Sequence, residues 1–455
     1  MSLKKNLLKN GLATVFQKLI RVFEQLALVP FFISAWGAAY YGEWLTLTIF
    51  PTIIGLSDLG IGSAAANTFV LRYGAKDYQG AANVYRSGRR LISASILASV
   101  LLGGIVIGLL DHYGVFARTL IARSDAILAV SFLMLAKLLD FFQQLYEAHF
   151  RAARHAARSI NLLSVYALIK IVGSILALTL GGGIISVAVV TFGTAIVFNA
   201  YFGWRATEQL KTDENYISKG YIIKSDMRMV AKKGFGYLLS PIWQSIYFQG
   251  TTFVVRITLG PEAVALFNTV RTVCRSINQL FNMVNSTVFP ELQYELSTGR
   301  LHIARLLFRR SLTLVLGTAI VGMLLLGLFG AQWYAWWTKH SLDPPPLMWH
   351  IFIIGIGFNA LWWTASMIFR AVNKPYVLVL AGLAGSVISV GLSYFLCLSH
   401  GLVGAALGSL ALEVIMVAVV LPVSCRYLGQ YVWQLPKGIW SDSAVLIKKI
   451  SKISK

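Results

Sequence analysis

Long apolar stretches recur through most of this 455-residue sequence, and they constrain its fold more than any other feature. A helix needs about 20 apolar residues to cross the roughly 30 Å hydrocarbon core of a bilayer. Only 13% of the residues are charged, whereas a soluble chain usually carries about a quarter. We therefore predict an all-α integral membrane protein with twelve transmembrane helices, in the windows 11–35, 43–70, 91–110, 126–149, 160–180, 183–204, 235–258, 263–289, 311–330, 347–369, 376–398 and 401–424.

The basic residues between these windows predict the orientation of the chain. Thirty of the 40 Lys and Arg fall on one side, and only Arg118, Arg123 and Lys339 fall on the other. Because loops rich in Lys and Arg stay in the cytoplasm, both termini are expected there. The first window carries three charges and no cleavage site follows it, so we interpret it as a retained helix. The net charge of +22 then reflects topology and contact with the lipid bilayer, not nucleic-acid binding.

Three pairs of short segments indicate an internal repeat. They match at separations of 218 or 219 residues: "FRAARHAARS" from Phe150 with "FRAVNKPYV" from Phe369, "GIISVAVVT" from Gly183 with "GLVGAALGS" from Gly401, and "YGEWLTLTIF" from Tyr41 with "LGPEAVALFN" from Leu259. Six spans per repeat is an even number, so the two halves have the same orientation. We predict two six-helix lobes related by a pseudo-twofold axis along the membrane normal.

The polar interruptions set the expected boundaries. The only long one falls near the midpoint of the chain. We predict a first lobe at 1–204, a cytoplasmic linker at 205–233, a second lobe at 234–425 and a basic cytoplasmic tail at 426–455.

These features together resemble a known family. The repeated six-span pattern, "YGEWLTL" followed by "GLSDLGIGSA", the two "FRA" segments and "GLVGAALGS" are similar to bacterial polysaccharide and O-antigen-type lipid-linked oligosaccharide flippases. These flippases belong to the multidrug/oligosaccharidyl-lipid/polysaccharide exporter (MOP) superfamily. The resemblance implies a multi-pass protein of the bacterial inner membrane that moves undecaprenyl-diphosphate-linked oligosaccharide to the outer leaflet. It implies alternating access around a cationic cavity, with the polysaccharide polymerase and chain-length machinery as further partners.

Charged residues inside the apolar windows are the candidate site. Each would cost roughly 2.5–3.5 kcal/mol if it faced lipid near the bilayer centre, so these side chains are expected to face protein or water. We predict a cationic cavity for the diphosphate, because basic residues outnumber acidic ones in the windows. Its candidate residues are Arg271, Arg275, Lys18, Arg21, Lys170 and Arg256. The alternatives are that these cations form buried ion pairs with carboxylates, or that Lys18 and Arg21 extend to the membrane surface.

A second group of residues is a candidate for ion coupling or a hinge. Lys137 and Asp140 are spaced i, i+3, which fits either an intrahelical ion pair or a titratable pair. Pro51 predicts a kink, since it removes one helical hydrogen bond, and Asp58 follows it among small residues. Asp58 either caps the distorted backbone or responds to a proton or cation. Glu24, in the first window, is a further candidate and is the carboxylate nearest Arg21 in sequence. Trp362, Trp363 and Asn359 could instead line a sugar path.

Missing motifs narrow the function. No P-loop, HExxH or GxSxG occurs, and the three cysteines form no metal-binding pattern, so we expect neither an enzyme nor a bound cofactor. The driving force would be a proton or sodium gradient, or removal of product outside the cell. A multidrug exporter of the same superfamily and a non-transporting component of glycan assembly are the alternative functions.

Overall fold

The structure is a computed structural model that describes residues 3–211, 219–372 and 374–442. Within those ranges every regular element is a helix, as the apolar windows predict. The chain divides by contacts into two compact units, Met1–Ser245 and Ile246–Lys455. Residues 212–218 of the predicted linker and 443–455 of the predicted tail lie outside the described residues.

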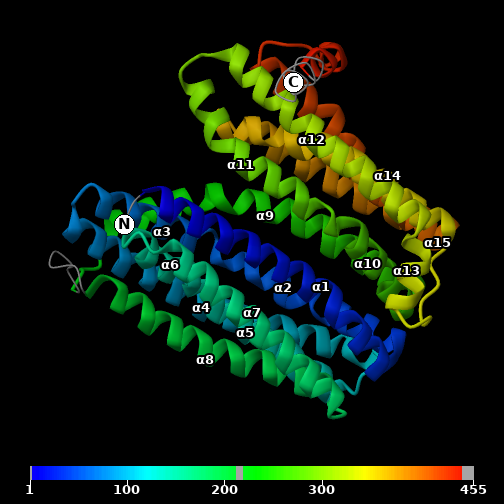
Figure 1. Cartoon of the computed structure of the whole chain (residues 1–455). Helices are drawn as coiled ribbons and strands as arrows, with labels where there is room; N and C mark the ends of the chain where they lie inside the picture. Colours follow the sequence, from blue (N-terminus) through cyan, green and yellow to red (C-terminus); the bar gives the residue numbers. More distant parts are fainter. Residues whose placement is uncertain (1–2, 212–218, 373, 443–455) are drawn as a thin grey trace. The chain divides into compact units, whose positions relative to one another are not determined.

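The first unit is an assembly of long helices that pack lengthwise (Figure 1). Helix α1 runs along α7, α5 along α8, and α3 along α4. In chain order the elements are α1 (Leu3–Leu47), α2 (Ile49–Ile54), η1 (Gly55–Asp58), α3 (Ile61–Gly74), α4 (Tyr78–His112), η2 (Phe116–Arg118), α5 (Arg123–Leu139), η3 (Asp140–Phe142), α6 (Gln143–Ala152), α7 (Ala156–Thr179) and α8 (Ile184–Lys211).

Two of the predicted spans in this unit are interrupted. The window 43–70 is divided among the end of α1, α2, η1 and α3, and the window 126–149 is divided at η3. In a regular α-helix the ring of a proline clashes with the backbone carbonyl of the residue four positions earlier. For Pro51 that residue is Leu47, and α1 ends there. Each interruption places a short 3₁₀ segment inside an otherwise α-helical span, and such segments often mark functional positions.

The second unit begins within a helix that starts in the first unit. Helix α9 (Lys224–Leu259) crosses the division between Ser245 and Ile246, so the two units are joined by a continuous helix. The predicted linker 205–233 accordingly contains the end of α8 and the start of α9. The remaining elements are α10 (Pro261–Ser276), α11 (Asn278–Ser297), α12 (Leu301–Leu328), α13 (Gly330–Trp337), α14 (Pro346–Ala371), α15 (Tyr376–Tyr427) and η4 (Val432–Gln434).

The helix lengths agree with a membrane protein. Among the described residues, seven helical segments are long and apolar enough to cross a bilayer. Two of them contain a turn glycine with positive φ, Gly37 and Gly401, and each extends over two predicted windows. The protein is therefore multi-pass, while the total of twelve spans, the symmetry and the cytoplasmic termini stay predictions.

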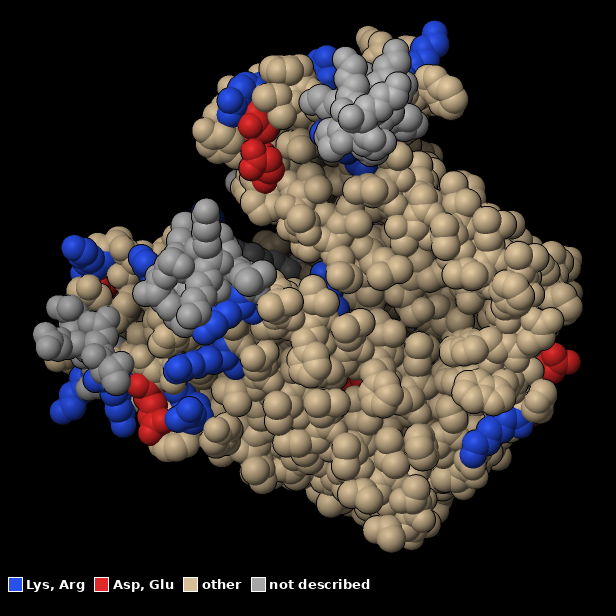
Figure 2. Space-filling model, viewed as in Figure 1, with Lys and Arg blue, Asp and Glu red and all other residues tan. Residues whose placement is uncertain are grey.

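The surface separates charged from apolar side chains. On the face shown in Figure 2, charged residues gather near the ends of helices, and the long middle sections are almost free of them. Exposed apolar residues cover these sections, for example Leu97, Leu101 and Ile105 on α4 and Leu314 and Leu324 on α12. Such surfaces suit contact with lipid tails, which is the environment that the sequence predicts.

Candidate functional site

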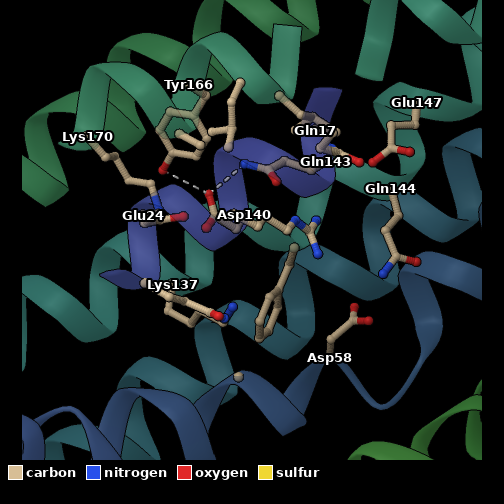
Figure 3. Close-up of a pocket in the computed structure, with 17 residues that line it drawn as sticks. Gln17, Glu24, Asp58, Lys137, Asp140, Gln143, Gln144, Glu147, Tyr166 and Lys170 are labelled. Atoms are coloured by element: carbon tan, nitrogen blue, oxygen red, sulfur yellow. Dashed lines mark hydrogen bonds and ion pairs between the residues drawn. The ribbon is translucent and has the colours of Figure 1, made fainter. Parts of the chain in front are cut away.

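A polar cavity of about 550 Å³ lies inside the first unit (Figure 3). Side chains from α1, α5, α6 and α7 line it, together with both 3₁₀ interruptions, η1 and η3. Irregular backbone at membrane depth is tolerated where it lines a polar cavity. Seven charged residues line the cavity: Arg21, Lys137, Lys170, Glu24, Asp58, Asp140 and Glu147. Four are carboxylates, so this cavity is not predominantly cationic.

The first interruption presents Asp58 to the cavity. Leu59 and Gly60 adopt positive φ, which interrupts the helical backbone before α3 begins. Asp58 Oδ1 accepts a hydrogen bond from the Gly62 backbone N–H at 3.2 Å, near the start of α3. The freed carbonyl of Ser57 accepts one from the Ser95 hydroxyl on α4. Asp58 therefore both caps the broken backbone and lines the cavity, so the two interpretations of its role are compatible.

The second interruption presents Asp140. Helix α5 ends at Leu139 and η3 begins at Asp140, with helical dihedral angles on both sides of the junction, so Lys137 and Asp140 keep their i, i+3 relation. Asp140 Oδ1 accepts hydrogen bonds from Gln143 Nε2 at 2.6 Å, Asn199 Nδ2 at 3.1 Å and the Tyr166 hydroxyl at 3.3 Å. These donors come from three elements, and they hold the carboxylate in one orientation.

The cations of this cavity have distinct surroundings. Lys170 Nζ lies 3.4 Å from Glu24 Oε1 and 5.2 Å from the centroid of the Tyr166 ring. Lys137 passes over Gly55, where a Cβ would lie only 2.9 Å from Lys137 Cε. Arg21 lines the cavity one turn from Glu24 on α1. For Lys170 the structure supports an ion pair, the alternative that the sequence left open.

Two predicted residues of this unit do not line the cavity. Lys18 is half-buried on α1, next to the cavity-lining Gln17. Pro51 is buried in α2, four residues before the cavity-lining Gly55. Pro51 shapes the interruption and acts on the cavity only through the backbone.

A second polar cluster lies inside the second unit, around Arg271 on α10. This side chain is only 7% exposed. Its guanidinium donates to Thr251 Oγ1 at 2.7 Å, to Thr252 Oγ1 at 2.9 Å and to Asn268 Oδ1 and the Phe248 carbonyl. Every described group that accepts a hydrogen bond from Arg271 is thus neutral. The positive charge is solvated by dipoles and is not cancelled by a carboxylate.

Arg275 lies one turn further along α10 and has a different environment. Its side chain is 32% exposed, its Nη1 lies 3.4 Å from Glu413 Oε1, and its guanidinium stacks 4.4 Å from the Phe248 ring centroid. Glu413 Oε2 also accepts hydrogen bonds from Asn359 Nδ2 at 3.0 Å and Trp362 Nε1 at 2.5 Å. Asn359 and Trp362 therefore orient a buried carboxylate, which does not fit the sugar path suggested for them.

The cluster around Arg271 borders a small cavity of about 30 Å³ inside the second unit. Arg271, Arg275, Tyr247, Ser409 and Glu413 are among its lining residues. That volume is enough for a bound water but not for a sugar ring. Arg256 lies in the last turn of α9 and lines neither cavity. The prediction that Arg271 and Arg275 share one cleft with Lys18 and Arg21 stays a prediction.

The structure adds site residues that the sequence interpretation passed over. Four glutamines and Tyr166 line the first cavity. Gln17, Arg21 and Gln25 recur every four residues and form a polar stripe along one face of α1. This periodicity could have identified the glutamines. No local sequence pattern identifies Thr251, Thr252 and Asn268 as site residues, because neutral polar residues are common in membrane helices.

The fold is that of MOP-superfamily transporters. An inward-facing multidrug resistance MATE family transporter of this superfamily matches with a TM-score of 0.74 and 17% identity, over 92% of this chain and 96% of that one. An outward-facing MATE family transporter matches at 0.63 and 16%, over 95% and 97%. A MOP superfamily transporter from Pyrococcus furiosus, described as having a binding pocket of reverse polarity that suggests a different function, matches at 0.60 and 15%, over 95% and 96%.

The family follows from the sequence. A family model described as "Polysaccharide biosynthesis protein" matches residues 4–293, more than half of the chain. The chain belongs to this polysaccharide biosynthesis family, and the resemblance drawn from its motifs is confirmed. A comparison with curated proteins found no match. The family is thus one of polysaccharide biosynthesis proteins, and the fold is shared with MATE family transporters.

Proposed function

We propose that this protein flips undecaprenyl-diphosphate-linked oligosaccharide units from the cytoplasmic to the outer leaflet of the bacterial inner membrane. The units would then enter synthesis of a cell-surface polysaccharide, with the polymerase and chain-length machinery as the next partners. Family membership supports this function over other transport functions. Flipping breaks no covalent bond, so the proposal requires binding sites and a change of access but no catalytic group.

The observation that carries the proposal is the buried charge of Arg271, whose described hydrogen-bond acceptors are all neutral. A guanidinium binds phosphate oxygens with two parallel N–H donors, and such bonds are strong in a site of low polarity. The cavity of about 30 Å³ beside Arg271 admits no diphosphate in this structure, so the proposal requires the change of access to open it. A diphosphate would then supply the anion that the neutral partners of Arg271 do not. Arg275, about one third exposed, is positioned to add a second cation.

Multidrug export is the second candidate, and one observation favours it. The cavity of the first unit has four carboxylates and three cations among its lining residues. A cationic drug would be attracted by such a lining. The two functions predict opposite results for a deletion strain and for variants of Arg271.

The experiment tests both functions in one set of strains. A deletion strain should accumulate lipid-linked glycan that faces the cytoplasm, and the wild-type gene should restore its transport. Arg271→Gln keeps hydrogen-bond donors but removes the charge, and we expect it to reduce flipping at least about tenfold, the effect of losing one charge-assisted contact. Arg271→Lys should retain part of the activity. Glycan orientation can be measured in spheroplasts with an impermeant glycosidase.

Two outcomes would contradict the proposed flippase function. Normal glycan orientation in the deletion strain together with increased drug sensitivity would favour the exporter. Full activity of Arg271→Gln, with wild-type abundance in the membrane, would exclude the diphosphate site and would fit a non-transporting component of glycan assembly. Lys437→Gln, on the chain beyond α15, is a matched loss of one cation outside both cavities and should leave flipping unchanged.

A further inference from the structure

We infer that the cavity of the first unit binds the sugar portion of the cargo and prefers uncharged or amino-bearing sugars to acidic ones. The inference rests on the proposed function, because it names the part of the cargo that this cavity would take. It concerns recognition of the sugar alone and not of the anionic headgroup.

The lining of the cavity has the hydrogen-bonding character of a sugar site. Each sugar hydroxyl is both a donor and an acceptor, and a carboxamide offers both complements. Four glutamines line the cavity, Gln17 and Gln25 on α1 and Gln143 and Gln144 on α6. Gln143 Nε2 donates to Asp140 and Gln144 Oε1 accepts from the Ser63 hydroxyl. A lipid tail would offer no partner to the remaining amide groups, which is unfavourable for buried polar atoms. The volume of about 550 Å³ falls within the usual range for small-molecule sites and admits a short saccharide.

Two carboxylates in the cavity are already fixed in orientation. The hydrogen bonds described for Asp58 and Asp140 are all made to Oδ1. Their Oδ2 atoms keep lone pairs for hydroxyl groups of a ligand. Because the donors to Oδ1 come from the backbone and from neighbouring helices, little side-chain entropy is lost when a sugar binds.

An aromatic ring completes the site. Tyr166 lines the cavity and stacks on Phe198, with ring centroids 4.2 Å apart and planes at 6°. Its hydroxyl donates to Asp140, so the ring is held at both ends. Phe198 stacks on the ring and the Lys170 ammonium lies over it, so Tyr166 forms a rigid wall of the cavity and is not a free stacking surface. Figure 3 shows Tyr166 beside Asp140 and Lys170, on the same side of the cavity.

The charges of the cavity predict its selectivity. Lys170 and Glu24 are 3.4 Å apart and largely cancel each other. The other charged lining residues are two cations, Arg21 and Lys137, and three carboxylates, Asp58, Asp140 and Glu147. A uronic acid would add a further negative charge to this excess, whereas an ammonium group would reduce it. The 30 Å³ cavity of the second unit has no room for a sugar ring.

The test compares three lipids that differ only in their sugar. The full chain is reconstituted in nanodiscs, and dissociation constants are measured for undecaprenyl diphosphate, undecaprenyl-diphosphate N-acetylglucosamine and undecaprenyl-diphosphate glucuronic acid. We expect the N-acetylglucosamine lipid to bind about tenfold more tightly than the bare lipid, equivalent to one or two net hydrogen bonds. The glucuronic acid lipid should bind about tenfold more weakly than the N-acetylglucosamine lipid.

Variants assign these differences to the cavity. Gln17→Leu combined with Gln144→Leu should remove the difference in affinity between the N-acetylglucosamine lipid and the bare lipid. Binding of the bare lipid itself should stay unchanged, and this unchanged affinity verifies that the double variant is folded. Gln79→Leu changes an exposed glutamine on α4 outside the cavity and should keep the gain. Glu147→Gln should reduce the discrimination against glucuronic acid several-fold, because it removes one negative charge.

Three results would overturn the inference. Equal binding of bare and glycosylated lipid by the wild type would do so while leaving the proposed function intact. A double variant that keeps the full gain would place the sugar elsewhere. Displacement of the N-acetylglucosamine lipid by a cationic dye, with no binding of bare undecaprenyl diphosphate, would assign the cavity to drugs and would contradict the proposed function as well.

Discussion

At the scale of single residues, the two interrupted spans each expose one carboxylate to the same cavity. Asp58 and Asp140 lie on η1 and η3, where the α-helical hydrogen-bond pattern is broken. A carboxylate in such a place can exchange a proton or bind a cation when water enters the cavity. We propose that these two residues couple transport to a proton or sodium gradient.

The coupling predicts a selective defect in transport. Asp58→Asn and Asp140→Asn should abolish the stimulation of flipping by an imposed proton or sodium gradient in proteoliposomes, because an amide cannot ionise. Flipping down the concentration gradient of the cargo itself should persist. Asp111→Asn is the control, since Asp111 pairs with Arg123 outside the cavity. If neither gradient stimulates the wild-type protein, the coupling proposal is wrong.

At the scale of elements, small residues allow α15 to fold back on itself. The segment "GLVGAALGS" begins at Gly401, whose positive φ separates the two halves of this helix. A Cβ at Gly404 would lie 1.9 Å from the Leu396 carbonyl oxygen, and one at Gly408 would lie 2.3 Å from the Ser393 backbone nitrogen. Backbones that approach this closely gain packing and hydrogen bonds, such as that from Ser389 Oγ to the Gly408 carbonyl at 2.7 Å.

This contact predicts that Gly408→Leu destabilises the second unit. The added side chain has no space, so the helical halves must separate, at a cost of at least about 1–3 kcal/mol. Gly391→Leu is the matched control on the same helix, because a Cβ at Gly391 has no atom within 4 Å. Thermal unfolding in detergent, followed by size-exclusion chromatography, should show a lower midpoint for Gly408→Leu only. Equal midpoints would refute this account of the motif.

At the scale of the whole molecule, the distribution of Lys and Arg predicts the topology. Thirty Lys and Arg lie on one predicted side of the membrane and three on the other, and such a division would be improbable in a chain without a fixed orientation. Two exposed positions on opposite predicted sides allow a direct test, Lys211 at the end of α8 and Ser124 at the start of α5. The three native cysteines are buried and give a low background.

We expect an impermeant maleimide to label Ser124→Cys in spheroplasts without further treatment. Lys211→Cys should be labelled only after the membrane is permeabilised, because α8 is predicted to end in the cytoplasm. Wild-type protein measures labelling of the native cysteines. The reverse pattern would show that the orientation is wrong and that the cargo would move in the opposite direction.

Much of the fold could be predicted because membrane insertion depends on local properties. The length and apolarity of a segment decide whether it can span, and these properties are contained within about 20 residues of sequence. Pro51 predicts part of the interruption at η1, since the effect of proline on its own helix is also local. Nothing in the sequence predicts the break at η3, because Lys137, Leu139 and Asp140 include no residue that breaks a helix by itself.

The sequence by itself determined that this chain is a multi-pass helical membrane protein, and that its intramembrane charges must avoid lipid, because both follow from the free energy of transfer of each segment. Only the tertiary structure decided the partner of each charge. It paired Lys170 with Glu24, surrounded Arg271 with neutral acceptors, and brought Asp58 and Asp140 to one cavity. Helical periodicity fixes the face on which a residue lies, but the rotation and depth of neighbouring helices set what it meets.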